Sequence, residues 1–398
     1  MTYDEMLARL GALRRYGMRP GLDAIRELLH RVGDPHVGMR VIHVGGTNGK
    51  GSTAAMIEAG LRASGRRTGL YTSPHLLRFT ERIRIDGDEL APARAAEVAE
   101  AVLAGGGEYT FFEVATAMAL LAFHRAGVDA VVLEVGLGGR LDATNVVEDK
   151  AVAVVTSVGL DHTDVLGPRI VDIAREKAGI FRRDTPALFA CDDEAAAILQ
   201  AEAERVGAAP IERFGRDFDD ADLPPLALGG AHQRRNAALA RRALEFAGVG
   251  ASAMRQGLAN VKWPGRLERL SPTVLVDAAH NEEGARALAA AWPDGDWTLV
   301  VGVVADKDAR AIVAPLAARA RRVIVTAPPS PRALPPAELA RMLPGASVAR
   351  DLATALAMAA GERVVVAGSI FLVGEARRLV LGEAADGAAV QDPVGQKL

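Results

Sequence analysis

The sequence predicts an α/β protein built from two doubly wound units, a larger N-terminal one and a smaller C-terminal one. The first observation is a glycine-rich turn at residues 45–51 that separates a short apolar strand from an Ala-rich helix. The second is a series of apolar runs alternating with helical stretches, the pattern of a parallel sheet covered by helices. The third is that this alternation restarts at Thr273 after a Pro-Gly hinge, so we place the domains at 1–267 and 268–398.

The composition is that of a soluble globular protein with room for two or three domains. The 398 residues are 49% hydrophobic and carry a net charge of −3, which does not favour a nucleic-acid or membrane-surface partner. The single cysteine, Cys191, excludes an internal disulfide. No basic region precedes an apolar core at the N-terminus, and no apolar run is long enough for a membrane span, so we expect a cytoplasmic protein.

Residues 41–53, VIHVGGTNGKGST, carry the clearest chemical signal. Glycines let the backbone approach a phosphate, the helix N-terminus points N–H groups at it, and Lys50 supplies a positive charge. The loop departs from G-x-x-x-x-G-K-[ST], because Val44 replaces the first glycine and Gly51 replaces the hydroxyl residue. A plain glycine turn is the alternative. The strand before it and the helix after it favour phosphate binding, with Ser52 able to supply a hydroxyl.

The elements around this loop follow from spacing and turn residues. Residues 2–32 predict two helices broken at Met18-Arg19-Pro20-Gly21, and a strand is predicted at 68–71. Ser73-Pro74-His75 then lies at the sheet edge, where α/β proteins place ligand groups, although a structural turn is the alternative for His75. The alternation at 82–86, ending in Asp86-Gly87, predicts a hairpin.

Two helices are predicted next, at 91–103 and from Thr110 to about Arg125. The second is strongly apolar and begins with Phe111 and Phe112. Adjacent phenylalanines at a helix start usually pack into the core, and a ligand contact is the competing interpretation.

Two buried strands, 129–135 and 152–156, end in polar residues. Glu134 stands at the end of the first, and a buried carboxylate is costly without a cation such as Mg²⁺. A structural ion pair with Arg140 is the alternative. The second strand leads to Asp161-His162-Thr163-Asp164, which favours a metal-ligand role for His162.

Beyond this point the chain predicts a strand, three helices and a hinge before the second unit. They are a helix at 174–181 carrying Lys177, a strand at 187–190, helices at 194–206 and 232–246, the latter with Asn236 near its start, and the hinge at 263–270. Arg266 in the hinge is either a surface charge or a phosphate clamp. The second unit has predicted strands at 273–276, 298–302, 322–325 and 363–366, the first ending in Asp277, and a disordered tail from about Asp386.

Ten strings stand in an order that resembles the dihydrofolate synthase/folylpolyglutamate synthase branch of the Mur-ligase superfamily. They are HVGGTNGKGST, TSPHL…ERI, TFFE, LEVGLGGRLDATN, LDHTDVLG, REKAGI, HQRRNAALA, PGRLE, DAAHN and GSIFLVGE. The resemblance implies an N-terminal P-loop ATPase domain of Mur-ligase type and a smaller C-terminal Rossmann-like domain, with the active site between them. It implies ATP- and Mg²⁺-dependent joining of L-glutamate to dihydropteroate or a reduced folate through an acyl phosphate. Arg19-Pro20 and Phe371 depart from the family's usual residues.

The same resemblance assigns roles to individual residues. The implied ATP contacts are Gly49, Lys50, Gly51, Ser52, Asn236, Arg266 and Asp277. The implied Mg²⁺ ligands are Ser73, Glu134 and His162. The implied pterin-side residues are Gly21, Leu22, Thr110, Phe111, Phe112, Glu113 and Leu141. Lys50, His162 and Lys177 form the implied catalytic set, with Lys177 carbamylated or, alternatively, a plain surface lysine. A monovalent cation is a further candidate ligand.

Two other functions compete with the folate ligase. One is a peptidoglycan-precursor amino-acid ligase of the same superfamily, which TFFE and the short N-terminus disfavour. The other is a nucleotide-binding switch without ligase turnover, which the presence together of Lys50, Glu134, His162 and Lys177 disfavours. The sequence leaves open whether only the first glutamate is added or a tail is also extended. We expect small-molecule partners, no nucleic acid, no membrane, and a monomer.

Overall fold

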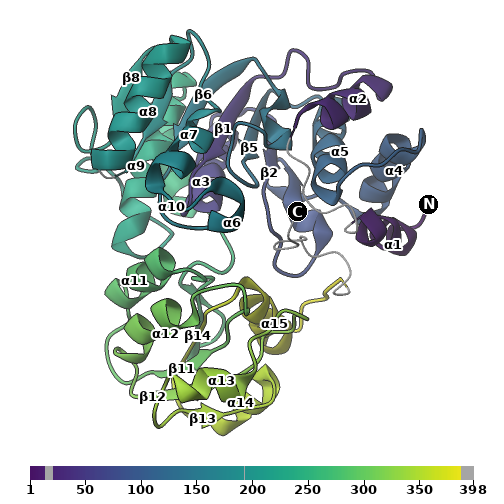
Figure 1. Ribbon diagram of the computed structural model, residues 1–398. Helices are drawn as coiled ribbons and strands as arrows, with labels where there is room; N and C mark the ends of the chain where they lie inside the picture. The colour runs from purple at the N-terminus through teal and green to yellow at the C-terminus, as the bar shows by residue number, and fades with distance from the viewer. Residues whose placement is uncertain (14–20, 192, 387–398) are drawn as a thin grey trace.

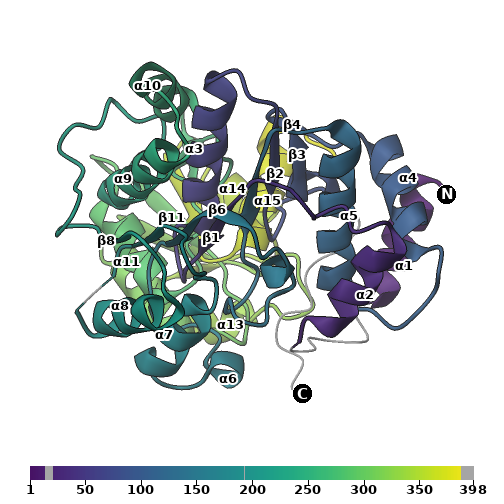
Figure 2. The same ribbon diagram turned by 90° about the horizontal axis from the view of Figure 1, so that it is seen from above.

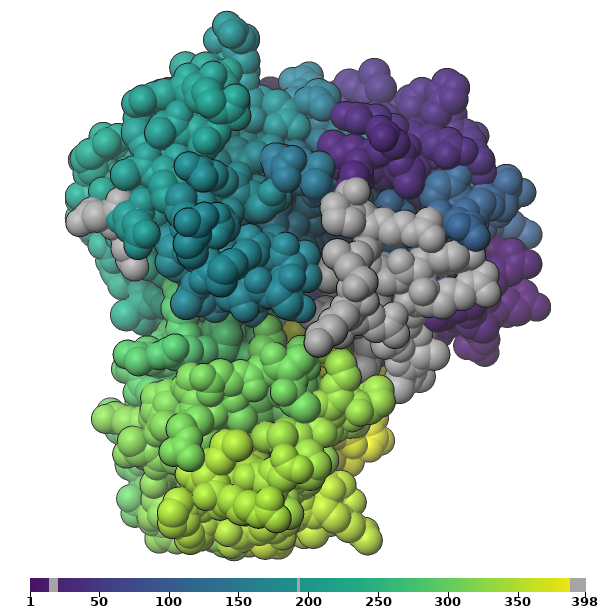
Figure 3. Space-filling view, in the orientation of Figure 1, coloured from purple at the N-terminus to yellow at the C-terminus, as the bar shows by residue number. Residues whose placement is uncertain are grey.

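A computed structural model describes residues 1–13, 21–191 and 193–386 and contains two α/β units, one above the other in the view of Figure 1. Figure 3 shows the smaller C-terminal unit, green to yellow, in contact with the larger N-terminal one. Residues 18–20 of the predicted break between the first two helices lie outside the described residues. In the part of the chain that is described, no helix is long and apolar enough to cross a membrane.

The N-terminal sheet has eight strands in the order β4-β3-β2-β5-β1-β6-β7-β8. The strands are β1 (Val41–Gly45), β2 (Thr68–Tyr71), β3 (Ile83–Ile85), β4 (Asp88–Glu89), β5 (Ala130–Glu134), β6 (Lys150–Val155), β7 (Ala187–Phe189) and β8 (Ile211–Arg213). The run from β2 to β8 is parallel, whereas β3 and β4 form the predicted antiparallel hairpin. Carboxyl ends of parallel strands meet at one edge, so the loops after β1, β2, β5 and β6 gather there.

Helices cover both faces of this sheet (Figure 2). They are α1 (Tyr3–Leu13), α2 (Asp23–Arg31), α3 (Lys50–Ala63), α4 (Pro92–Leu103), α5 (Phe111–Ala126), α6 (Thr163–Leu166), α7 (Ile170–Ala178), α8 (Asp193–Val206), α9 (Ala231–Phe246) and α10 (Ala251–Asn260), with 3₁₀ turns η2 (Phe79–Arg82) and η3 (Ala143–Val146). Side chains of β1 alternate between two cores. Val41 packs with α1, α2, α4 and α5, whereas Ile42 and Val44 pack with α3, α9 and α10.

The C-terminal sheet has six strands in the order β13-β12-β11-β14-β10-β9. Its strands are β9 (Glu268–Arg269), β10 (Val274–Val276), β11 (Thr298–Val301), β12 (Arg322–Val325), β13 (Ser347–Val348) and β14 (Val364–Ala367). Its helices are α11 (Glu282–Ala290), α12 (Ala309–Ala317), α13 (Pro336–Arg341), α14 (Leu352–Met358) and α15 (Ile370–Leu381). Only β9 is antiparallel among the described strands of this sheet. The predicted doubly wound α/β architecture is confirmed for both units.

Sequence patterns missed the short strands β8, β9 and β13 and the helix α10. The strands have two or three residues, too few to display a period. The sequence predicts no element over the α10 segment, in which Gly257 has a packing role. A Cβ on Gly257 would lie 2.5 Å from the backbone nitrogen of Gly60, so the glycine lets α10 cross α3 closely.

The expectation that disorder begins near Asp386 is wrong for that residue. Its carboxylate accepts hydrogen bonds from the Tyr3 hydroxyl at 2.8 Å and from the Phe79 backbone N–H at 2.6 Å. The segment after α15 therefore returns to the N-terminal unit and is fixed there at Asp386.

Candidate active site

The phosphate loop connects the end of β1 to Lys50 at the start of α3. Gly49 precedes the helix with φ +85°, a left-handed conformation that favours glycine, and a Cβ there would lie 2.4 Å from the Asn236 side chain. The Lys50 ammonium donates to the carbonyl oxygens of Gly46 and Thr47, both at 3.1 Å. The loop therefore curls around its own lysine at a helix N-terminus, an arrangement suited to binding an anion.

Asn236 on α9 reaches the start of α3 through a residue that the sequence interpretation overlooked. The Asn236 amide donates to Gln233 Oε1 at 3.0 Å, and Gln233 Nε2 donates to the Ser52 hydroxyl at 3.3 Å. All three side chains are buried. Gly51 lies against the Trp263 indole, since a Cβ there would be 3.0 Å from Nε1. Gln233 precedes Asn236 by one helical turn, and that spacing was the signal that could have identified it.

Glu134 ends β5, which lies beside β1 in the sheet, so its carboxylate comes next to the phosphate loop. Glu134 is only 5% exposed, and its Oε2 accepts the backbone N–H of Ser73 at 3.1 Å. Burial raises the pKa of Glu134 to about 7, and the charge of Lys50 opposes this shift. The alternative of an ion pair with Arg140 is wrong, because Arg140 instead binds Glu176 at 2.7 Å.

His162 precedes the short helix α6 with a left-handed backbone, φ +51°. Burial lowers the pKa of His162 to about 4, although the neighbouring Asp161 carboxylate acts in the opposite direction. The ring is therefore neutral at pH 7, which is the form of imidazole that binds a metal. The charge of Lys50 also lowers this pKa, so His162 lies within electrostatic range of the phosphate loop.

Ser73 and Glu134 line one hollow and carry oxygen atoms of the kind that Mg²⁺ binds together with water and phosphate oxygens, whereas His162 is not among the residues that line it. A buried carboxylate with a raised pKa is costly to ionise, and a bound cation would relieve that cost. Within residues 1–13, 21–191 and 193–386, no three His, Cys, Asp or Glu side chains gather where they could hold a metal ion by themselves. The predicted set has only two such side chains, so it needs oxygen atoms from a bound nucleotide and stays a prediction.

Lys177 on α7 is 3% exposed, so the alternative of a plain surface lysine is wrong. Burial and then the positive charge of Lys50 lower the pKa of Lys177 to about 7. The carboxylates of Asp161, Glu283 and Asp142 act in the opposite direction. In a large fraction of the molecules, Lys177 is therefore a neutral amine near pH 7.

The predicted nucleotide residues Arg266 and Asp277 lie where the hinge meets the C-terminal sheet. Asp277 is buried just after β10 and accepts the backbone N–H groups of Leu267 and Ala279, both at 2.9 Å. Burial raises the pKa of Asp277, and the Arg266 guanidinium opposes this shift. His232 at the start of α9 also lowers it, so α9, the hinge and the second sheet meet at this point.

A hollow between the two units brings several predicted residues together. It is lined by Gly51, Ser73 and Glu134 from the N-terminal unit, by Trp263 and Arg266 from the hinge and by Ile370 from α15, among others. Gly51 after the phosphate loop, two of the three predicted metal ligands (Ser73 and Glu134) and the predicted clamp Arg266 therefore border one space, whereas His162 is not among the residues that line it. That space could hold a ligand contacted by both units.

The predicted acceptor-side string TFFE has two parts with different surroundings. The Thr110 hydroxyl accepts the Glu113 N–H at 3.2 Å, and the Glu113 carboxylate accepts the Thr110 N–H at 2.7 Å, forming a capping box at the start of α5. Phe111 is fully buried in the core. Phe112 is half-buried and lies over Gly136, where a Cβ would be 2.4 Å from the ring.

The other predicted acceptor-side residues lie around the same helix. Gly21 and Leu22 precede α2, and Leu22 packs on the core cluster that Phe112 also contacts. Leu141 is half-buried in the loop that follows β5. Helix α2 and the turn η3 both contact α5, so these segments surround its beginning and one side.

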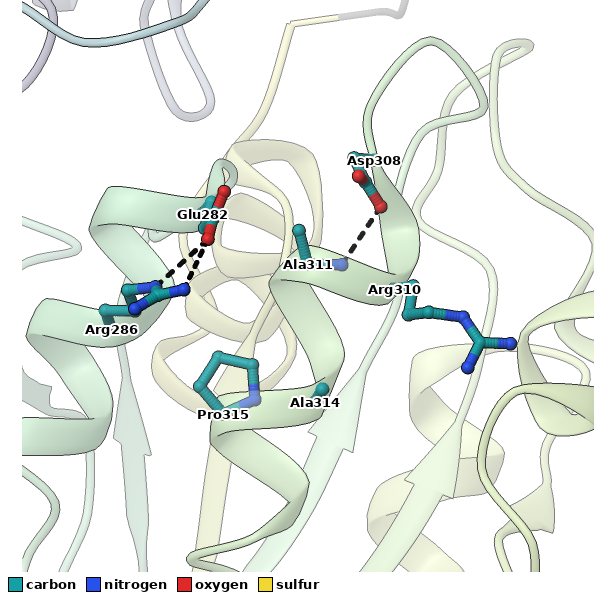
Figure 4. Close-up of a pocket in the computed structure, with 7 residues that line it drawn as sticks. All are labelled: Glu282, Arg286, Asp308, Arg310, Ala311, Ala314 and Pro315. Atoms are coloured by element: carbon teal, nitrogen blue, oxygen red, sulfur yellow. Dashed lines mark hydrogen bonds and ion pairs between the residues drawn. The ribbon is translucent and has the colours of Figure 1, made fainter.

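A second hollow lies between α11 and α12 on the C-terminal unit (Figure 4). Three of its four charged side chains, those of Glu282, Arg286 and Asp308, have partners within it. Arg286 pairs with Glu282 at 2.6 Å, and Asp308 accepts the Ala311 N–H at 3.0 Å to cap α12. Of the residues predicted to carry the chemistry, Gly51, Ser73, Glu134 and Arg266 line the other hollow, between the units, whereas Lys50, His162 and Lys177 are not among its lining residues.

Comparison with known sequences and structures identifies the family. Residues 44–224 match the Mur ligase middle domain, and residues 265–370 match the Mur ligase glutamate ligase domain. The chain is 39% identical over 95% of its length to a probable bifunctional folylpolyglutamate synthase/dihydropteroate synthase of Haloferax volcanii, of which it spans 50%. It is 35% identical over 96% of its length to the folylpolyglutamate synthase of Lacticaseibacillus casei, of which it spans 99%.

Solved structures of the same family share the fold. Escherichia coli FolC in complex with DHPP and ADP is 34% identical, with a TM-score of 0.89 and coverage of 96% of this chain and 98% of that one. A Yersinia pestis bifunctional folylpolyglutamate synthase/dihydrofolate synthase with AMPPNP and a Mn ion is also 34% identical, with a TM-score of 0.87 and coverage of 96% and 98%. This chain therefore belongs to the dihydrofolate synthase/folylpolyglutamate synthase family of Mur ligases.

Proposed function

We propose that this protein is an ATP- and Mg²⁺-dependent ligase that joins L-glutamate to dihydropteroate, to a reduced folate, or to both. The observation that carries this proposal is the hollow between the two units, which Gly51 beside Lys50, the buried carboxylate of Glu134, and Arg266 of the hinge all line. The E. coli relative with DHPP and ADP and the Y. pestis relative with AMPPNP and a Mn ion support the same assignment.

The reaction needs activation because a carboxylate is a poor acceptor for an amine. Transfer of the γ-phosphoryl group of ATP to the pterin-linked carboxylate gives an acyl phosphate, whose phosphate is a good leaving group. The glutamate amine attacks the acyl carbon, a tetrahedral species forms, and phosphate departs. The protein's part is to position reactants and neutralise charge.

The residues of the phosphate loop would hold the nucleotide at the N-terminal unit. Gly49, Gly51 and Ser52 would present backbone and hydroxyl groups to the phosphates, and Lys50 would exchange its carbonyl contacts for phosphate oxygens. Asn236, Arg266 and Asp277 would hold the rest of the nucleotide from α9, the hinge and the end of β10. The two units would therefore close on ATP from opposite sides.

Ser73, Glu134 and His162 would hold Mg²⁺ at the edge of the sheet. When bound, the ion supplies positive charge that stabilises the transferring phosphoryl group. The neutral ring of His162 and the buried carboxylate of Glu134 are prepared for that role. We extend the proposal to a monovalent cation bound near the Mg²⁺ ion.

Lys177 would act as a carbamate. The neutral amine adds to CO₂ and loses a proton, so a buried amine becomes an anion. An anion in place of a group that can carry a positive charge relieves repulsion of Mg²⁺, and a pKa near 7 makes the reactive amine available. The anion would order the metal site beside the phosphate loop.

The acceptor would lie at the beginning of α5. Phe112, Leu22 and Leu141 offer partly exposed apolar faces for a pterin ring, with Gly21 beside them, while Thr110, Glu113 and Phe111 would support them from within the fold. The domain boundary at 267/268, a monomeric state, a cytoplasmic location and the absence of nucleic-acid or membrane partners remain predictions.

A product assay tests the function directly. ADP formation is measured with ATP and Mg²⁺ while dihydropteroate, tetrahydrofolate and L-glutamate are each present or omitted. We expect ADP only when a pterin acceptor and glutamate are both present. Failure of every pterin acceptor would reject the proposal and favour a Mur ligase of other substrate, whereas nucleotide binding without turnover would favour a switch.

A further inference from the structure

Asn48 of the phosphate loop is bonded to the C-terminal unit through both atoms of its side-chain amide. Its Nδ2 donates to Glu283 Oε2 at 2.7 Å, and its Oδ1 accepts from Asn281 Nδ2 at 3.0 Å. Asn281 and Glu283 stand at the beginning of α11, the helix of the C-terminal unit that contacts α9 (Figure 1). One donor and one acceptor fix the orientation of the Asn48 amide, so the contact is specific.

The backbone of Asn48 is held just as firmly by the N-terminal unit. Its N–H donates to Ser157 Oγ at 3.0 Å, and its carbonyl accepts from the Thr156 hydroxyl at 2.6 Å. The next two residues are Gly49 and Lys50. A displacement of α11 would therefore be transmitted through one residue to the part of the loop predicted to hold phosphate.

The same contact reaches the loop that carries His162. Asn281 uses its second amide hydrogen to donate to Asp161 Oδ2 at 3.2 Å, while its Oδ1 accepts the Gly284 N–H and caps α11. The Glu283 carboxylate lies against Gly159, where a Cβ would be 3.0 Å from Oε2. One turn at the start of α11 thus touches the segments after both β1 and β6.

We propose that Asn48 is a positioning residue that couples the phosphate loop to closure of the C-terminal unit, so that productive use of ATP requires α11 in place. This inference rests on the proposed function. We call the hydrogen bonds of Asn48 to Asn281 and Glu283 the bridge. Without the bridge, the acyl phosphate would form in a site whose C-terminal wall is misplaced. Water would then attack the acyl carbon in place of the amine, releasing phosphate and regenerating the carboxylate, and ATP would be consumed without a new amide.

The test measures ADP formed per amide formed, together with the KM values for ATP and glutamate. We expect a ratio near one in wild type, a several-fold higher ratio in N48A, and a larger rise in the KM for glutamate than for ATP. A second variant, E283A, removes the acceptor without changing the loop and covers the case in which N48A does not fold. Unchanged ratios and KM values in both variants would overturn the proposal.

Two further variants make the assignment specific. In N48D/E283Q the donor and acceptor are reversed, since the new amide can donate to the new carboxylate, and we expect the ratio to return toward one. R235A is the matched control, because Arg235 on α9 pairs with Glu283 at 3.6 Å without belonging to the phosphate loop. A rise in R235A equal to that in N48A, or no recovery in the double variant, would overturn the role of Asn48.

A measurement without turnover separates this inference from the proposed function. Small-angle X-ray scattering with AMPPNP and Mg²⁺ should give a smaller radius of gyration for wild type and R235A than for N48A. If wild type ligates no pterin acceptor but this difference is present, the proposed function fails and the bridge stands. If the radii are equal, the bridge is a static contact and the inference is wrong.

Discussion

The phosphate side and the acceptor side of the candidate active site are built on different principles. On the phosphate side, Glu134 and Lys177 are buried titratable groups whose pKa values are both moved to about 7. On the acceptor side, Thr110 and Glu113 bind each other, and Phe111 lies in the core. The phosphate side contains buried titratable groups that a bound ligand would stabilise. On the acceptor side, the polar groups of Thr110 and Glu113 already have hydrogen-bond partners within the fold.

This difference suggests how substitutions will act. Removing a charged group from the phosphate side should reduce catalysis more than stability, because its favourable partner is the ligand. Removing a group from the acceptor side should reduce stability more than catalysis, because its partner is another residue of the fold. Phe112 is the exception on the acceptor side, since its ring is only half-buried.

The largest effect is expected for Lys50→Ala. The variant loses the charge that would neutralise the ATP phosphates, and ligation should fall by about 10³-fold or more. Stability should change little, because the lysine makes only two hydrogen bonds to its own loop. Coupled ADP assays and thermal unfolding check both values. Near-normal turnover would contradict the phosphate-loop assignment and, with it, the proposed difference between the phosphate side and the acceptor side.

The next effect is expected for Lys177→Ala, with a loss of about 10²-fold in ligation. A short carboxylic acid in the buffer should restore part of the activity by replacing the carbamate anion. Since carbamylation needs the neutral amine and the pKa is about 7, wild-type carbamylation and activity should rise as pH increases through 7 at constant CO₂.

Carbon-13 NMR in labelled bicarbonate checks the carbamate itself. The signal should be present in wild type and absent in Lys177→Ala. Arg175→Ala is the matched control, because Arg175 is an exposed cation on the same helix and its loss should leave the signal unchanged. Full activity of Lys177→Ala in CO₂-free buffer, with no signal in wild type, would exclude the carbamate.

A smaller effect is expected for the metal site. Glu134→Gln and His162→Ala should each raise the Mg²⁺ concentration needed for half-maximal activity by about 10–100-fold. A Mg²⁺ titration of ligation measures this change, with unfolding temperature recorded in parallel. An unchanged Mg²⁺ requirement in both variants would assign these residues a structural role and make the two regions alike.

The strand-ending residues and the phosphate loop could be predicted because each depends on a local pattern. An apolar run ending in Gly45-Gly46 or in Glu134 is readable within about ten residues, and the sheet then places such ends at one edge. The TFFE string was ambiguous because burial of Phe111 but not Phe112 is decided by helix orientation in the fold.

Contacts between distant segments could not be predicted in the same way. Asn48 and Glu283 are 235 positions apart, and Gln233 and Ser52 are 181 apart. No local periodicity encodes such pairs, since they depend on how the two units and α9 pack. For the same reason the role of Gly257, which permits a close crossing of α10 and α3, could not be predicted from the neighbouring sequence.

The smallest effects are expected within the TFFE string, where Thr110 and Phe112 should affect different quantities. Thr110→Ala removes the helix cap and should lower the free energy of unfolding by about 1 kcal/mol, with an unchanged KM for the acceptor. Phe112→Leu keeps an apolar side chain but loses ring contact, and should raise the acceptor KM about five-fold, equivalent to about 1 kcal/mol, with little loss of stability. Denaturant unfolding and acceptor titrations measure both quantities for both variants. If Phe112→Leu changes only stability, the ring belongs to the core and the pterin would have to bind elsewhere.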